Sequence, residues 1–231
     1  MEPSLPPVFE VPLFPLPDVV LFPGTILPLR IFEPRYKTML ADALKGPQFL
    51  AMARLKPGWE DAYLEAPALF PMVGVGRIVA HQQLDDDTYQ IALLGLSRAR
   101  IQSEIQKEPY RIATVVRIED DPILEPALEA SARSTQRTLL DTARALMNRV
   151  LRPDARKQIA RSLAERKSLG GAADLLASVF LQDPDLRQTL LEETSALRRA
   201  NMVEEALERF CEQLEPPPPP TTGRHDDFNP N

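Results

Sequence analysis

The spacing of apolar residues changes near Asp121-Pro122, and this change limits the possible folds more than any other feature. Before it, short segments rich in β-branched residues alternate with turns. In Tyr110–Ile118, for example, successive residues would face opposite sides of a strand. After it, apolar residues recur every three or four positions, as in amphipathic helices. The pattern predicts an α+β protein, with a β-rich subdomain over residues 1–121 and an α-helical subdomain over residues 122–215.

An early segment, residues 12–36, is dense in both proline and apolar residues: PLFPLPDVVLFPGTILPLRIFEPRY. Proline lacks a backbone N–H, so it is tolerated in turns, at strand starts and in edge strands. We therefore expect Thr25–Ile31 to form an edge strand, and Pro34 to begin a helix that ends at Gly46. An apolar stripe along this helix is predicted from the three- and four-residue spacing of Tyr36, Met39, Leu40, Ala43 and Leu44. The apolar side chains of the segment should still face a core. The predicted core residues are Leu13, Val19, Leu21, Ile26, Leu29 and Ile31.

Further strands are predicted at Phe49–Leu55 and in a hairpin formed by Val73–Leu84 and Thr88–Ile101. Several short strands with one helix inserted early favour a small, partly closed β-barrel. Gly74 and Gly76 form a Gly-x-Gly pair without the third glycine and the helix of a dinucleotide-binding loop. We expect these glycines to relieve crowding in, or to bend, a barrel strand.

The second half of the chain predicts five helices. They span residues 126–151, 154–168, 171–182, 184–197 and 198–214. Asp154 and Asp183, each beside a proline, are expected to be N-caps, and Gly170-Gly171 to separate two helices. Residues 216–231 contain too few apolar side chains to pack, so we expect a disordered, proline-rich tail.

The composition is that of a globular protein of a reducing compartment. The single cysteine, Cys211, excludes an internal disulfide framework, and no apolar run free of proline is long enough for a signal peptide or a membrane span. We therefore expect a cytoplasmic protein without a membrane partner. The formal net charge of −6 disfavours general nucleic-acid binding.

The charges are distributed unevenly along the helical half. Residues 126–167 carry ten Lys/Arg and four Asp/Glu, whereas residues 168–215 carry four and ten. One interpretation is a phosphate-binding face for RNA on the basic helices. The favoured interpretation is that the basic and acidic helices pack together in one bundle, since no aromatic residue is interleaved for base stacking.

Residues with catalytic or metal-binding chemistry are scarce. The chain has two histidines, and His225 lies in the predicted tail, which leaves His81 as the one candidate base. One cysteine and two histidines cannot build a structural zinc site, and no phosphate-binding loop motif is present. We predict no catalytic residues, no cofactor and no metal; the alternative of an enzyme would use His81 or a pair of carboxylates as the base.

Residues 12–36 resemble the start of the N-terminal substrate-binding domain of ATP-dependent Lon proteases, with a short strand, a Leu-Pro-Asp-Val-Val turn, Phe-Pro-Gly and a second strand leading into a helix. Residues 73–101, VGVGRIVAHQQLDDDTYQIALLGLSRARI, resemble the central hairpin of that family. Residues 174–207 resemble the helical part that follows. The resemblance covers about residues 9–214.

The resemblance implies a PUA-like β-barrel followed by a helical bundle, in a region that recognises unfolded or tagged polypeptides and contributes to assembly. The ATPase and Ser-Lys protease domains of Lon have no counterpart in this sequence, so neither activity is expected. The resemblance suggests a stand-alone bacterial member: a non-catalytic protein- or peptide-binding module, acting as an adaptor or regulator in proteolysis or protein quality control. The alternative is an RNA-binding PUA-like protein that uses helices 126–167.

Client binding is expected in a cleft where the barrel meets the bundle. The candidate peptide-binding residues are Phe22, Pro23, Trp59, Tyr63 and Phe70. The competing interpretation is that these side chains only seal the ends of the barrel. The expected partners are unfolded or client polypeptides and a protease or chaperone, and the sequence leaves the oligomeric state open.

Overall fold

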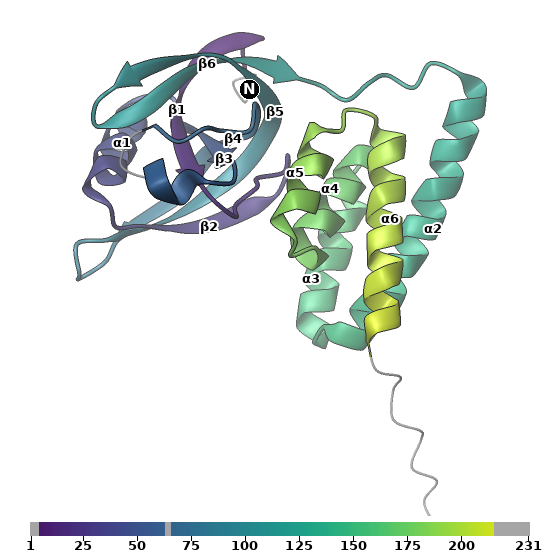
Figure 1. The fold of residues 1–231 in the computed structure, drawn as a ribbon. Helices are drawn as coiled ribbons and strands as arrows, with labels where there is room; N and C mark the ends of the chain where they lie inside the picture. The colour runs from purple at the N-terminus through teal and green to yellow at the C-terminus, as the bar shows by residue number, and fades with distance from the viewer. Residues whose placement is uncertain (1–4, 63–65, 215–231) are drawn as a thin grey trace, which may run out of the picture.

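The computed structural model, which describes residues 5–62 and 66–214, contains a β-barrel followed by a helical bundle (Figure 1). The strands are β1 (Val8–Leu16), β2 (Ile26–Ile31), β3 (Phe49–Arg54), β4 (Met72–Gln83), β5 (Tyr89–Lys107) and β6 (Tyr110–Ile118). The helices are α1 (Pro34–Lys45), inserted between β2 and β3, and then α2 (Pro126–Val150), α3 (Pro153–Ala164), α4 (Leu169–Phe180), α5 (Pro184–Glu192) and α6 (Ala196–Gln213). The α+β class and the early inserted helix are confirmed.

The barrel closes through the 19-residue strand β5. The strand order is β2-β5-β4-β3-β1-β6, and β6 pairs back onto β5, so that β5, β4, β3, β1 and β6 form a ring. The β1–β3 pair is parallel and the other pairs are antiparallel. Because β5 is so long, its first part also pairs with β2 and its second part with β6. Closure leaves the five strands of the ring without a free edge, whereas β2, which pairs with β5 alone, keeps one.

Strand β2 is the edge strand, as expected, and its register explains one wrong core prediction. Side chains alternate along it, so that Ile31 is buried while Ile26 shares the outer face with Arg30 and is 65% exposed. Ile26 is therefore not a core residue. The backbone N–H of Gly95 donates to the carbonyl of Thr25, so the backbone groups of every second residue from Thr25 onward point toward β5. The backbone of Pro28 therefore points toward the free edge. Because no strand pairs with that edge, the N–H that proline lacks costs no hydrogen bond.

Helix α1 packs against the barrel at β1 and β6 with the apolar stripe that the sequence predicted. Tyr36, Met39, Leu40 and Ala43 are buried on it, next to barrel residues such as Phe14, Leu21 and Ile31. Leu13 and Leu21 are also fully buried, and Val19 and Leu29 are half-buried. A second barrel cluster, which includes Leu13, lies on the other side of the sheet. Both faces of the barrel sheet are thus covered by buried apolar side chains.

Two glycines allow the loop after β1 to lie directly on the barrel wall. A Cβ atom on Gly74 of β4 would lie 2.0 Å from the carbonyl oxygen of Leu21, and one on Gly95 of β5 would lie 2.1 Å from that of Phe22. Both neighbours are backbone atoms, which cannot rotate away. The prediction that Gly74 relieves crowding is therefore confirmed. The consequence is that Leu21 and Phe22 are held between the barrel and the helices.

The helix starts are partly as predicted. Asp183 caps α5 by accepting a hydrogen bond from the Asp185 N–H at 2.9 Å. Asp154 is not a cap, because α3 already begins at Pro153 and Asp154 lies in its first turn. Gly170-Gly171 does not separate helices either. Ser168 caps α4 by accepting from the Gly171 N–H at 3.1 Å, so both glycines lie inside that helix.

The bundle core includes residues of the barrel half. Leu139, Leu176, Leu190 and Val203 belong to one buried cluster with Val20, Phe22 and Met72. Strand β6 ends at Ile118 and α2 begins at Pro126, and we keep the division at 121/122 as a proposal. The predicted tail, residues 216–231, lies outside the described residues. Within residues 5–62 and 66–214, no helix combines the length and apolar composition of a membrane span.

We predict that Gly95→Ala lowers the free energy of unfolding by about 2–4 kcal/mol, because the new methyl group overlaps the Phe22 carbonyl. Gly46→Ala is the matched control. Its nearest atom would be 3.8 Å away and its φ is −115°, so a change below about 1 kcal/mol is expected. Urea unfolding of both variants measures the difference, and equal stabilities would contradict the close approach.

A candidate binding cleft between the barrel and the bundle

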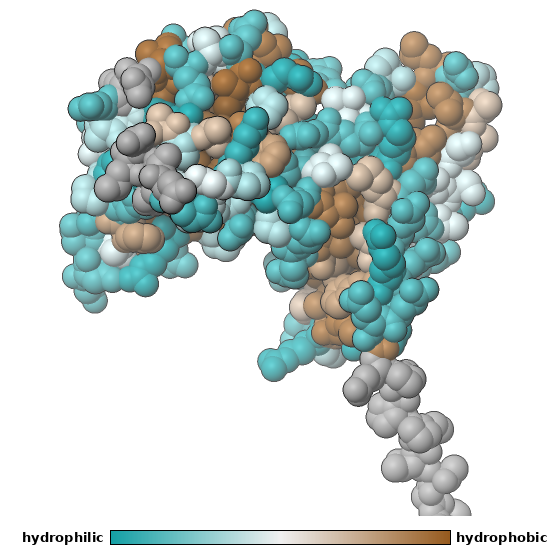
Figure 2. Space-filling view, viewed as in Figure 1, coloured by the Kyte–Doolittle hydropathy of each residue, from teal (hydrophilic) through white to brown (hydrophobic). Residues whose placement is uncertain are grey.

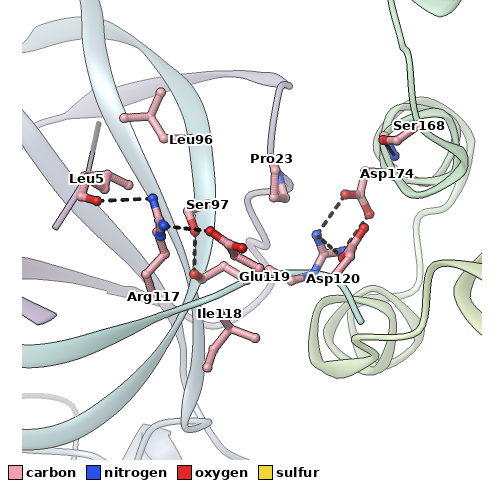
Figure 3. Close-up of a pocket in the computed structure, with 12 residues that line it drawn as sticks. Leu5, Pro23, Leu96, Ser97, Arg117, Ile118, Glu119, Asp120, Ser168 and Asp174 are labelled. Carbon is pink, nitrogen blue, oxygen red and sulfur yellow. Dashed lines mark hydrogen bonds and ion pairs between the residues drawn. The ribbon is translucent and has the colours of Figure 1, made fainter. Parts of the chain in front are cut away.

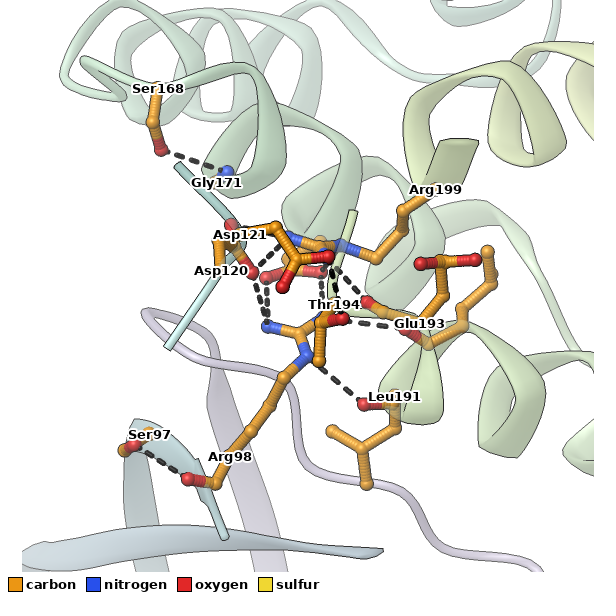
Figure 4. A network of polar contacts seen from close by, with 12 residues as sticks. Ser97, Arg98, Asp120, Asp121, Ser168, Gly171, Leu191, Glu193, Thr194 and Arg199 are labelled. Carbon is orange, nitrogen blue, oxygen red and sulfur yellow. Dashed lines mark hydrogen bonds and ion pairs between the residues drawn. The ribbon is translucent and has the colours of Figure 1, made fainter. Parts of the chain in front are cut away.

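A buried arginine of the barrel joins the two parts of the molecule. Arg98 of β5 is 3% exposed and forms a bidentate ion pair with Asp174 of α4, with N···O distances of 2.8 and 2.6 Å (Figure 4). Its Nε also donates to the Leu191 carbonyl at 3.0 Å. One barrel side chain thus contacts α4 and the end of α5. Such paired, directional hydrogen bonds fix orientation as well as distance.

A second buried arginine completes the network from the opposite side. Arg199 of α6 is 0% exposed and donates to Asp120, in the segment between β6 and α2, at 2.9 and 2.7 Å. Its Nε lies 3.0 Å from the same Asp174 that holds Arg98, and its Nη1 donates to the Glu193 carbonyl at 2.6 Å. We call Arg98, Asp120, Asp174 and Arg199 the junction network. Its two cations and two anions balance.

Gly170 makes room for this network. A Cβ atom there would lie 2.2 Å from Asp120 Oδ2 and 2.3 Å from Arg199 Nη2. The first turn of α4 can therefore approach the ion pairs only because this position has no side chain. The predicted role of Gly170 as an interhelix break is replaced by this steric one.

Apolar and further ionic contacts surround the network. Phe22 and Val20 from the loop after β1 pack in the bundle core, where the guanidinium of Arg187 lies 5.8 Å from the Phe22 ring and donates to the Val20 carbonyl. Burial lowers the pKa of Arg187. Arg54 of β3 reaches Asp185 at the start of α5, with an N···O distance of 2.6 Å. Barrel and bundle therefore meet along a broad, specific contact.

A cleft of about 660 Å³ lies next to this contact (Figure 3). The barrel side provides Leu5, Leu96, Ser97, Arg98, Arg117 and Ile118, the loop and linker provide Pro23, Glu119 and Asp120, and α4 provides Ser168, Gly171 and Asp174. The side chains that give it apolar surface are Leu5, Pro23, Leu96 and Ile118. In Figure 3, Leu96 and Arg117 lie on the barrel side and Asp174 on the helix side.

The polar groups of the cleft are largely engaged with one another. Arg117 donates to the Leu5 carbonyl at 3.2 Å and to Glu119 at 2.6 Å. Ser97 donates to a backbone carbonyl, and Ser168 caps α4. The lining contains no histidine or cysteine. In the part of the chain that the structure describes, no group of three or more His, Cys, Asp or Glu could hold a metal ion. The arrangement is therefore suited to binding through shape, apolar contact and hydrogen bonds.

The predicted peptide-binding residues do not form one site. Pro23 lines the cleft. Phe22 is 0% exposed, so the expectation that it presents its ring to a peptide is wrong; the ring fills the bundle core instead. Phe70 is half-buried beside the cations of Arg54 and Lys56, at 5.0 and 6.0 Å from its ring centre.

Two of the candidates stay open. Trp59 is half-buried in a single 3₁₀ turn, Trp59–Ala62, and is not among the cleft residues. Tyr63 lies outside the described residues. A role of Trp59 or Phe70 in binding remains a prediction.

No local sequence pattern indicates the junction network. Arg98, Arg199 and Asp174 look like the surface residues that charged side chains usually are. The one available signal is that Arg98 belongs to the Arg-Ala-Arg stretch that contributes to the family resemblance. Their burial depends on contacts between distant segments, 76 positions apart for Arg98 and Asp174 and 79 for Arg199 and Asp120, which no local pattern reports.

The basic helix α2 packs with the acidic helices α4 and α6 in one bundle, as the favoured interpretation of the sequence has it, but two of its exposed ion pairs lie within the helix itself. Arg133 and Arg144 pair with Glu129 and Asp141 of their own helix, α2, and not with the acidic helices that follow. All four side chains are more than half exposed, so these pairs add little to stability.

The family model of the ATP-dependent protease La (LON) substrate-binding domain matches residues 10–209. The chain belongs to this family. Among solved structures, the N-terminal domain of the Mycobacterium avium complex Lon protease has a TM-score of 0.66 at 15% identity, covering 87% of this chain and 98% of that domain. The Lon N-terminal domain protein from Xanthomonas campestris has a TM-score of 0.55 at 22% identity, with coverages of 90% and 99%. These two likenesses show the fold alone.

Similar sequences are found in Lon proteases. Lon protease 2 of Sorangium cellulosum (strain So ce56) is 28% identical over 217 residues, which are 92% of this chain and 26% of that protein. Lon protease 2 of Myxococcus xanthus is 27% identical over 208 residues, covering 88% of this chain and 24% of that protein. The chain therefore spans about a quarter of the length of these relatives. The match is to the substrate-binding domain of Lon.

We predict that Arg98→Met destabilises the protein by about 3–5 kcal/mol, because it leaves Asp174 with one buried partner fewer. The double variant Arg98→Met/Asp174→Leu should recover part of the loss, since Arg199 keeps its pair with Asp120. The control Arg144→Met removes an exposed ion pair and should cost less than about 1 kcal/mol. Chemical denaturation of the four proteins tests this, and additive losses in the double variant would contradict a coupled network.

Proposed function

We propose that this member of the Lon substrate-binding domain family is a non-catalytic recognition module that binds extended segments of client polypeptides in the cleft between its barrel and its bundle. The observation that carries the proposal is the cleft of about 660 Å³ with walls from both parts of the molecule. Concave sites of this size between subdomains, mostly apolar with a few placed polar groups, are typical binding sites.

The lining residues support a polypeptide as the ligand. Leu96 and Ile118 provide half-buried apolar surface from neighbouring strands, and Pro23 adds to it from the loop. Arg117 has N–H donors beyond the two that it gives to Leu5 and Glu119, and the donating hydroxyl of Ser97 keeps its acceptor lone pairs, so both can bond a peptide backbone. The apolar part would take side chains, and the polar part would satisfy the backbone groups that binding removes from water.

We further propose that the module acts in the cytoplasm as an adaptor or regulator of proteolysis or protein quality control. The family is defined by the substrate-binding domain of a protease, and the relatives in which this segment recurs are Lon proteases. A separate protease or chaperone would then act on the bound client.

The proposal predicts that the full chain binds a reduced and alkylated, permanently unfolded protein and ignores the same protein in its native state. Leu96→Ala and Ile118→Ala should each weaken binding about threefold to tenfold, because each removes apolar surface from the cleft. Fluorescence anisotropy of the labelled client measures the dissociation constants.

Ile26→Ala is the matched control, since Ile26 is an exposed apolar residue of the barrel that does not line the cleft. It should bind the client as the unchanged protein does. Equal affinities for the control and both cleft variants, with thermal melts showing folded proteins, would place client binding elsewhere. No binding of the unfolded protein at all would overturn the function itself.

A further inference from the structure

The first turns of α2 extend beyond the start of α6, the helix that packs beside it. Thr135 of α2 donates to Asn201 of α6, and Arg149 donates to the Cys211 and Leu214 carbonyls, so the two helices run side by side in the same direction. Ala196, the first residue of α6, comes five residues before Asn201 and is therefore level with residue 130 of α2. In Figure 1 the start of α2 lies beyond the start of α6. All six residues of Pro126–Ser131 are exposed. We call residues 124–131 the overhang.

The apolar stripe of α2 continues into the overhang without a partner in the described chain. Within the bundle the stripe buries Ala132, Leu139, Ala143 and Leu146 against the core. Leu128, four residues before Ala132, extends the same side of the helix, and Leu124 lies just before the N-cap Glu125 of α2. Leu128 is 42% exposed and Leu124 is 81% exposed. The surface that α2 buries against α6 is thus continuous with an uncovered one.

The surroundings of this stripe are acidic. Residues 118–132 contain five Asp or Glu and no Lys or Arg, and two of these carboxylates, Glu119 and Asp120, pair with Arg117 and Arg199. Glu125 and Glu129 lie on the overhang itself, and Glu129 has only a 3.5 Å ion pair with Arg133, in which both side chains are more than half exposed. Figure 2 shows apolar residues gathered at this end of α2 with hydrophilic residues around them. An apolar strip with a rim of one charge sign is a directional recognition surface.

We propose that the overhang docks a basic amphipathic segment of a partner polypeptide. Its apolar side would cover Leu124 and Leu128, and its Lys or Arg side chains would lie beside Glu125 and Glu129. A second copy of this chain fits less well. Two overhangs face to face would bring carboxylates against carboxylates, with no basic residue of the overhang to offset them. The surface is separate from the client cleft, whose lining includes no residue of the overhang.

The test uses the full chain and an 18-residue helical peptide of leucine and lysine in amphipathic order, with a matched peptide of leucine and glutamate. Fluorescence anisotropy should show salt-sensitive binding of the lysine peptide and none of the glutamate peptide. Leu124→Ser/Leu128→Ser should weaken binding about tenfold or more, because both apolar contacts are lost. Glu125→Gln/Glu129→Gln should weaken it and flatten its salt dependence.

The control Ile26→Ser/Val79→Ser removes exposed apolar side chains from the barrel instead and should leave the affinity unchanged. The cleft variant Leu96→Ala should also bind the lysine peptide normally, so that failure of the client-binding proposal is distinguishable from failure of this one. Equal binding of the two peptides, unchanged affinity in the overhang variants, or no binding by the full chain would overturn the proposal. So would a dimer in sedimentation equilibrium that Leu124→Ser/Leu128→Ser abolishes, which would make a second copy the occupant.

Discussion

The pairing of Arg98 with Asp174 is the interaction on which the arrangement of the two parts depends. A guanidinium with only 3% of its surface exposed has lost almost all of its hydration, and this loss is compensated only while its partners stay in place. Those partners belong to α4 and α5, far along the chain from β5. Barrel and bundle therefore cannot separate or slide without leaving a buried charge unpaired. Apolar packing alone would tolerate more relative positions, because it is not directional.

The network also explains why the junction holds the cleft. Arg98, Asp120 and Asp174 are at once members of the buried network and part of the cleft lining. Where charged groups need partners at fixed angles, apolar side chains cannot fill all of the space around them. The cleft walls are consequently fixed by the same hydrogen bonds that join the two parts. A site whose walls are already in position loses less conformational entropy when a ligand binds.

The sequence predicted those features that depend on neighbours along the chain. The start of α1 at Pro34, the cap of α5 at Asp183 and the apolar stripe of α1 follow from local chemistry, and the structure confirms them. The predictions from sequence failed where a contact between distant segments decides the outcome. Ile26 is apolar, as core residues are, but the pairing of β2 with β5 puts it on the outer face. For the site, Pro23 lines the cleft, and its role in peptide binding stays a prediction.

The error at Phe22 is informative because the ring is buried, as one interpretation had it, but not in the barrel. It lies in the bundle core, and the loop that carries it is held there by the close approach of its carbonyl to Gly95. A glycine in a strand thus determines where an aromatic residue of another segment can lie. The same logic holds at Gly170, where a missing side chain admits two ion pairs. At both places the junction depends on a glycine that leaves space for another segment. Local sequence patterns are read from the side chains that are present, so they do not reveal which glycines have this role.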